Sequence, residues 1–202
     1  AIQKLLPGSR LYTGMAASGS AMRALRSPLV LHIATHGFSA ATNTEAPSEA
    51  GDTMFNAGLV FAGANAVLRG REIDPLMGAA ILTGEEAATL HLAGTELVVL
   101  SACRSGLGQP VRGEGVFGLH RAFASAGARS VVVSLWKIPD AETKDLMVDF
   151  YRELRQGRQR ASALREAKRR MRKKHSHPFF WGSFLCHGDW RPVPGITQVR
   201  EP

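Results

Sequence analysis

The chain has 202 residues, of which 45% are hydrophobic and 7% aromatic, with 25 lysines and arginines against 17 aspartates and glutamates. This composition excludes a disordered chain and a collagen-like repeat, and the length favours one domain built around one core. The net charge of +8 points towards nucleic acid. Between Arg152 and Lys174, however, eleven basic residues stand beside two acidic ones, so this segment carries +9 and the rest of the chain −1. The basicity is therefore local.

The two cysteines, Cys103 and Cys186, are too few for a disulfide-stapled secreted domain. The N-terminal region does not resemble an export signal, and no apolar run approaches the ~18 residues that cross a bilayer. We therefore expect a soluble, cytoplasmic protein that has no membrane partner.

In chain order, the pattern predicts a helix over Met15 to Leu25 and then a buried strand over Leu29 to Thr35. Apolar runs rich in β-branched residues predict two more buried strands, Leu97 to Ala102 and Ser130 to Trp136. Strands of this kind, separated by helices, indicate an open, mostly parallel α/β sheet with helices on both faces.

Further helices are expected between and after these strands, each ending near a glycine. Their spans are Glu85 to Leu92, Gly115 to Ala126, a stretch from Asp140 to Gly157, and a basic amphipathic helix from about Arg160. The polar stretch Phe38 to Thr53 is expected to be a loop whose role the sequence leaves open. The aromatic segment His175 to Trp190 is expected to contribute a last strand, and residues 191–202 a C-terminal tail.

Two of the predicted strands lead directly into reactive side chains. The first runs into His36 and Gly37, and the second runs into Cys103. If these strands are neighbours, His36 and Cys103 meet at the carboxyl edge of the sheet, where α/β proteins place their functional groups. A thiolate nucleophile beside an imidazole is the pair used in covalent acyl transfer. Either residue alone would more often be structural, so the interpretation depends on their joint placement.

Five segments resemble the CHAT domain, the caspase-like peptidase domain that is often attached to TPR repeats in bacteria. The segments stand in family order, and they are Leu31 to Gly37, Gly58 to Asn65, Ile81 to Gly108, Gly113 to Trp136 and His177 to Trp190. The resemblance covers nearly the whole chain from Leu11 onward. The resemblance implies a caspase-like α/β fold over residues 1–190, from which an N-terminal part of the family domain is missing. It also implies a regulatory TPR domain in cis or in trans.

The resemblance further implies a catalytic dyad, with Cys103 attacking the scissile carbonyl of a protein substrate and His36 acting as general acid and base. The backbone amides of Gly37 and Cys103 would form the oxyanion hole. No metal or organic cofactor is implied. Arg104 follows the cysteine where family members commonly carry an acidic residue, and it either favours the thiolate or points into solvent.

Substrate-pocket walls are expected near the end of the third strand, at Ser134 and Trp136, because caspase-like pockets lie there. Asp140 or Asp189 would favour basic side chains if either lined the pocket. The alternative is that Trp136 fills the core and that Asp140 stabilises the start of the following helix.

Three other interpretations compete. Gly113 to Gly118 satisfies the dinucleotide-binding pattern, but it stands ten residues after its strand. His175, His177, Cys186 and His187 are zinc-ligand types without the spacing of a closed site. The basic segment 152–174 would suit a non-catalytic adaptor that binds nucleic acid or an acidic partner, although such a face is usually only solvated.

Overall fold

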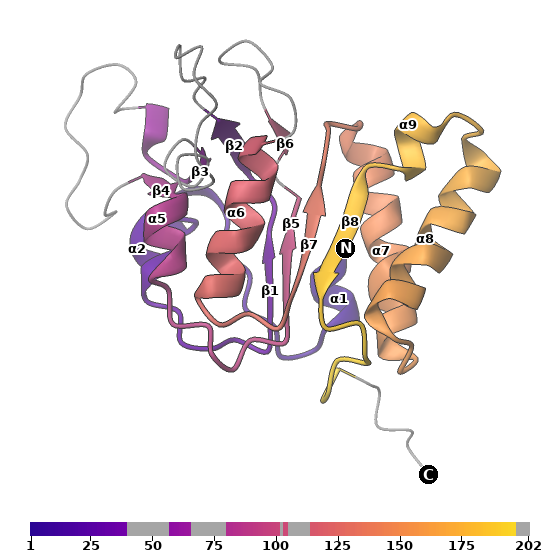
Figure 1. The fold of residues 1–202 in the computed structure, drawn as a ribbon, viewed down its shortest axis with the longest axis horizontal. Coiled ribbons are helices and arrows are strands. Elements are labelled where there is room, and N and C mark those ends of the chain that lie inside the picture. Colours follow the sequence, from indigo (N-terminus) through magenta and orange to yellow (C-terminus); the bar gives the residue numbers. More distant parts are fainter. Residues whose placement is uncertain (40–56, 66–79, 102, 105–113, 197–202) are drawn as a thin grey trace.

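The computed structural model of this protein describes residues 1–39, 57–65, 80–101, 103–104 and 114–196. Its main sheet is mostly parallel and has helices on both faces (Figure 1). The strands are β1 Val30–Ile33, β2 His36–Ser39, β3 Ala57–Val60, β4 Ile81–Thr83, β5 Leu97–Leu100, β6 Cys103–Arg104, β7 Ser130–Ser134 and β8 Phe184–Gly188. The helices are α1 Ile2–Leu5, a 3-10 turn at Gly14–Ala16, α2 Gly19–Arg23, α5 Gly84–Ala88, α6 Glu114–Ser125, α7 Asp140–Arg155, α8 Arg160–Lys174 and α9 Pro178–Trp181.

The main sheet has the strand order β1-β5-β7-β8. The first three strands are parallel, as expected, and each is shorter than the apolar run that predicted it. β8 pairs with β7 in the antiparallel direction. The fold is therefore an α/β fold with a mostly parallel sheet, as the sequence predicted.

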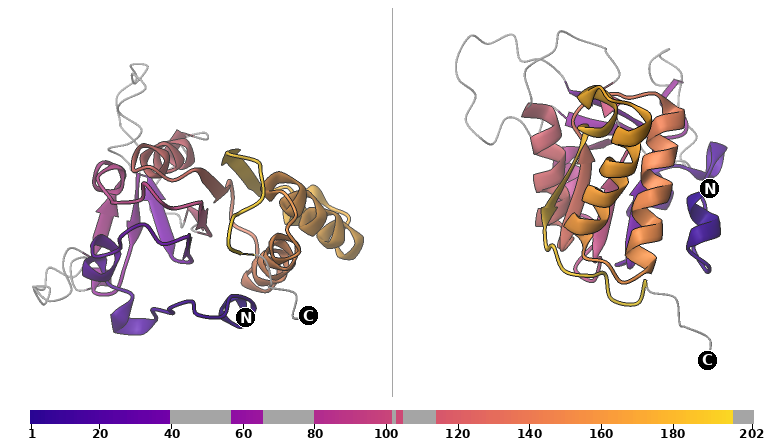
Figure 2. Two further views of the ribbon diagram at one scale, coloured as in Figure 1. Left: turned by 90° about the horizontal axis from the view of Figure 1, so that it is seen from below. Right: turned by 90° about the vertical axis from the view of Figure 1, so that its right-hand side faces the viewer.

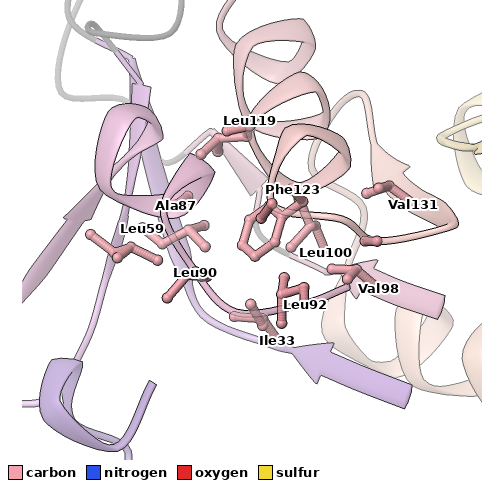
Figure 3. Packing of buried hydrophobic residues seen from close by; sticks show 14 of the residues in the cluster. Ile33, Leu59, Ala87, Leu90, Leu92, Val98, Leu100, Leu119, Phe123 and Val131 are labelled. Carbon is pink, nitrogen blue, oxygen red and sulfur yellow. The ribbon is translucent and has the colours of Figure 1, made fainter. Parts of the chain in front are cut away.

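The two faces of the main sheet bury alternate residues of each strand. Val98 and Leu100 of β5 pack in a cluster with α2, α5 and α6, whereas Leu97 and Val99 pack with α7 and α8. Phe123 of α6 lies at the centre of the first cluster, where Leu59 and Leu92 surround it (Figure 3). Figure 2 shows the helices on opposite sides of the strands. This two-sided burial explains why these strands are almost continuously apolar.

A second sheet, which the sequence did not predict, lies beyond the carboxyl ends of β1 and β5. Its strand order is β4-β3-β2-β6, with β2 and β3 antiparallel and β2 and β6 parallel. The strands are two to four residues long, too short to produce an amphipathic pattern of their own. This sheet carries the residues of the predicted dyad.

The structure corrects the prediction at both ends of the chain. The helix expected over Met15 to Leu25 is a 3-10 turn followed by α2, because the Ser18 hydroxyl accepts a hydrogen bond from the Ala21 amide and starts a new helix. The aromatic C-terminal segment forms the short helix α9 before β8 begins. Beyond β8, in the segment expected to be a tail, Val193 and Ile196 are buried in the α7–α8 cluster.

The cations of the basic segment are only partly free for an outside partner. Arg158 and Arg170 pair with the buried Glu153, and Lys174 pairs with Asp145. Arg160 is fully buried between Glu96 and Asp189, neither of which belongs to the segment. Acidic residues both inside and outside the segment therefore occupy several of its cations. No helix in the described part of the chain is both long and apolar enough to span a bilayer.

A partly buried histidine on β1 makes the stability depend on pH. Burial lowers the pKa of His32 from 6.5 to about 4, and its Nδ1 lies 3.0 Å from the Tyr151 hydroxyl. The unfolded chain binds this proton below pH 6.5 and the folded chain does not, so stability falls from pH 6.5 to pH 4. We expect a loss of about 1–3 kcal/mol over this range, since one pKa unit corresponds to about 1.4 kcal/mol. Urea unfolding of the parent and of His32→Gln measures it; an equal loss in both would contradict this assignment.

Candidate active site

His36 and Cys103 begin the two parallel strands of the second sheet that lie next to each other. β1 and β5 are neighbours in the main sheet, and the chain passes from β1 into β2 and from β5 into β6. In the β2–β6 pair, His36 is the register partner of Cys103 and Gly37 is the register partner of Arg104. Neighbouring strands run about 4.8 Å apart, so the backbones of the two dyad residues lie side by side. The meeting that the sequence predicted is therefore present.

The surroundings of His36 suit a group that works on an outside molecule. His36 is exposed at the start of β2, whereas Gly37 behind it is buried. On its other side β2 pairs with β3, where Val60 is the register partner of His36. The imidazole is thus open to solvent while its backbone is held between two strands.

Thr35, just before His36, stabilises the start of β2. Its hydroxyl donates a hydrogen bond to the Val60 carbonyl, the residue opposite His36. Thr35 is not among the site residues that the sequence predicted. The sequence feature that could have identified it is its position between a buried strand and a reactive side chain, where a hydroxyl can bond to the backbone of a neighbouring strand.

The predicted pocket residues lie at the same end of the main sheet as the dyad. Ser134 ends β7, which neighbours β5, so both strands finish at the carboxyl edge of the sheet. The Ser134 side chain is buried and donates to the Trp136 carbonyl, and the indole of Trp136 donates to the Phe179 carbonyl. Trp136 packs against the α7–α8 cluster. Its indole therefore holds α9 in place.

The two acidic candidates differ in position. Asp140 is the first residue of α7, is exposed, and follows shortly after the end of β7. Asp189 follows Gly188, which is the register partner of Ser130 at the start of β7. Asp189 therefore lies at the amino edge of the parallel strands, opposite the dyad, where it pairs with Arg160 and Arg191. It does not line a pocket beside Cys103.

Three further predictions concern the loop after His36, the glycine pattern at Gly113 and a metal site. The loop expected over Phe38 to Thr53 begins as strand β2 up to Ser39, and its remainder lies outside the described residues. The glycine pattern that starts at Gly113 leads into α6, which begins at Glu114. Within the described ranges, no three histidine, cysteine, aspartate or glutamate side chains gather to hold a metal ion.

Comparison with known families identifies the family of this chain. The family model described as "CHAT domain" matches residues 1–189. The chain belongs to the CHAT domain family. Similar proteins include tetratricopeptide repeat protein 28 from human, 37% identical over 110 residues, and its mouse counterpart, 36% identical over 110 residues. Each match covers 54% of this CHAT domain and 4% of the relative, so the chain spans a small part of the proteins it resembles.

A Thr35→Val variant tests how the CHAT domain holds its histidine. Valine keeps the β-branched shape but leaves the Val60 carbonyl without this donor, which costs about 1–3 kcal/mol when the group is sheltered from water. If the dyad is catalytic, kcat should fall roughly tenfold with little change in KM, because about 1.4 kcal/mol of lost alignment is a factor of ten. Thr35→Ser should restore both values. An unchanged kcat in Thr35→Val would remove Thr35 from the positioning of His36.

Proposed function

We propose that this CHAT domain is a cysteine endopeptidase that cleaves a peptide bond in a protein substrate through His36 and Cys103. The observation that carries the proposal is the register pairing of the two residues across β2 and β6. Register partners on neighbouring strands belong to the same face of a sheet, which supports a base next to a nucleophile at this position. Membership of a caspase-like family makes acyl transfer the favoured chemistry.

In the proposed reaction, the Cys103 thiolate attacks the scissile carbonyl carbon and a C–S bond forms. The backbone amides of Gly37 and Cys103 are the proposed donors to the developing oxyanion. His36, protonated at this stage, gives its proton to the amine as the C–N bond breaks. Water then attacks the thioester, its proton passes to His36, and the C–S bond breaks to release the acid and the thiolate.

Substrate side chains are proposed to meet the carboxyl edge near Trp136 and Asp140, with Ser134 as a buried support. Trp136 is partly exposed and Asp140 is exposed, so both are accessible from solvent. Asp140 is an acidic group in this region that would favour a basic residue at the cut. Asp140→Asn should therefore raise KM for peptides cut after arginine and leave those cut after alanine unchanged.

The proposal includes control by a tetratricopeptide repeat domain. Two of the relatives are tetratricopeptide repeat proteins, and the matched region is 4% of each. Such a domain would act by shifting the population of ordered active-site loops.

Incubation with a complex mixture of peptides, followed by sequencing of new N-termini, tests the proposed activity. The parent should generate cuts that share a side-chain preference, and Cys103→Ala should generate none of them. His91→Ala, which removes an exposed histidine outside the strands of the second sheet, is the matched control and should cut like the parent. Equal cutting by Cys103→Ala would overturn the proposal.

A further inference from the structure

The outer edge of β8 is open in the described structure. β8 ends the main sheet and pairs only with β7 among the described strands. The Leu135 amide donates to the Ser183 carbonyl, and the Asp189 amide donates to the Arg129 carbonyl. Bonding towards a neighbour alternates along an antiparallel strand, so the odd-numbered residues of β8 face β7. The backbone groups of Phe184, Cys186 and Gly188 therefore point away from the sheet.

This edge lacks the usual protection against pairing. Exposed edge strands commonly carry a proline, a lysine or another charge, and β8 carries none of these from Phe184 to Gly188. Five residues span about 17 Å, enough for two or three pairs of backbone hydrogen bonds with an added strand. β8 is thus suited to accept an extended segment of polypeptide.

Helix α8 lies beside β8 (Figure 1) and carries a row of cations. Lys168 is close enough to Cys186 for the two groups to interact electrostatically, and burial is the main cause that lowers the pKa of Lys168. Arg165 and Arg172 stand three positions before it and four after it, so all three share one side of the helix. We name Arg165, Lys168 and Arg172 the cation stripe.

The cation stripe is not used by the fold itself. Arg165 and Arg172 are exposed, and no ion pair with another described residue engages either of them. Their neighbours Arg169 and Arg170, by contrast, pair with Glu166 and Glu153. From Arg165 to Arg172 the stripe extends about 10 Å along the helix, at 1.5 Å per residue. Alternate side chains of an added strand repeat about every 7 Å, so two carboxylates on one face could reach it.

We infer that β8 and the cation stripe together form a docking site for an extended, acidic segment of a partner protein. The segment adds as a strand to β8, and its alternate glutamates or aspartates face Arg165, Lys168 and Arg172. The site is separate from His36 and Cys103, so it recruits a partner without needing the dyad.

Charge argues against a second copy of this chain as the occupant. Antiparallel pairing of β8 with its own copy would follow a two-fold axis perpendicular to the sheet, which puts both copies of α8 on the same face. The two cation stripes would then face each other, and like charges in contact cost several kcal/mol. A polyanion such as RNA would satisfy the arginines but not the backbone groups of Phe184, Cys186 and Gly188.

The test measures binding of a synthetic probe of about seven residues, in which glutamate alternates with valine, to the full chain carrying Cys103→Ala. Fluorescence anisotropy gives the affinity, and hydrogen exchange over residues 183–189 reports strand addition. We expect slower exchange of this segment with the glutamate probe and no binding of the same peptide with lysine in place of glutamate.

Matched variants separate the two parts of the site. Arg172→Glu should weaken binding roughly tenfold or more, because it replaces an attraction by a repulsion. Lys173→Glu makes the same charge change on another side of α8 and should alter binding less than twofold. Cys186→Pro removes an outward amide without touching the bonds to β7 and should abolish binding, whereas Cys186→Ala should not.

Four results would overturn the inference. They are no binding of the glutamate probe, equal losses in Arg172→Glu and Lys173→Glu, undiminished binding by Cys186→Pro, and a dimer in sedimentation that Cys186→Pro converts to a monomer. Competition by a single-stranded oligonucleotide that leaves exchange of residues 183–189 unchanged would assign the stripe to nucleic acid instead.

Discussion

His36→Ala should lower kcat/KM for a cleaved peptide by about 10²–10⁴-fold, the usual contribution of a positioned acid and base. His36 is exposed, so its removal leaves no cavity and the urea midpoint should stay unchanged. The measurement is initial rate against peptide concentration, with kcat and KM separated. The loss should appear in kcat, because the imidazole acts on the proton of the leaving group rather than on substrate binding.

Added imidazole distinguishes a chemical role of His36 from a structural one. A small base that enters the space left by the side chain should recover part of kcat in His36→Ala and none in Cys103→Ala. His91→Ala should match the parent throughout. A His36→Ala variant that keeps the parental kcat would remove the histidine from the reaction.

The largest effect on stability is expected at Arg160. This side chain is fully buried at the start of α8, where Nη2 lies 2.5 Å from Glu96 and Nη1 lies 3.4 Å from Asp189. A cation at a helix N-terminus opposes the helix dipole, so the two carboxylates account for its presence there. Arg160→Ala opens a cavity and takes one cation from each carboxylate, which leaves Glu96 with Arg129 and Asp189 with Arg191. We expect a loss of about 2–4 kcal/mol in the free energy of unfolding. Urea denaturation measures it.

Two controls separate the charge of Arg160 from its packing. Arg169→Ala breaks an exposed ion pair with Glu166 on the same helix and should cost less than about 1 kcal/mol. Combining Arg160→Met with Glu96→Gln fills the space and removes a carboxylate charge that has lost its buried partner, so it should recover part of the loss. If Arg160→Ala and Arg169→Ala lower the free energy of unfolding equally, the buried ion pairs of Arg160 stabilise the fold no more than an exposed pair does.

The sequence predicted the main sheet because a strand buried on both faces is apolar at nearly every position. Val131, Val132 and Val133 are apolar without alternation, as a central parallel strand requires. The meeting of His36 with Cys103 was predictable only on the condition that the strands before them are neighbours, a condition that the pairing of β1 with β5 meets. The helices at Asp140–Arg155 and Arg160–Lys174 were predictable from their apolar spacing.

Other features depend on contacts between residues far apart in the sequence. The second sheet pairs segments too short to show a period, and its order depends on how the chain folds back after His36. Arg160 has the composition of a solvated helix face, and only the arrival of Glu96 and Asp189 makes it a buried residue. The position of Asp189 at the far end of the sheet follows from the antiparallel direction of β8, which local sequence does not encode.

Covalent labelling tests the central claim most directly. The parent chain is incubated with peptidyl acyloxymethyl ketones, which react with a thiolate held beside a bound peptide, and the adduct is located by mass spectrometry. We predict a single adduct on Cys103 that forms faster in the parent than in His36→Ala, while Cys186, whose pKa burial raises, stays unmodified. A thiol-directed probe that modifies Cys186 in preference to Cys103, or that labels Cys103 equally fast without His36, would contradict the account.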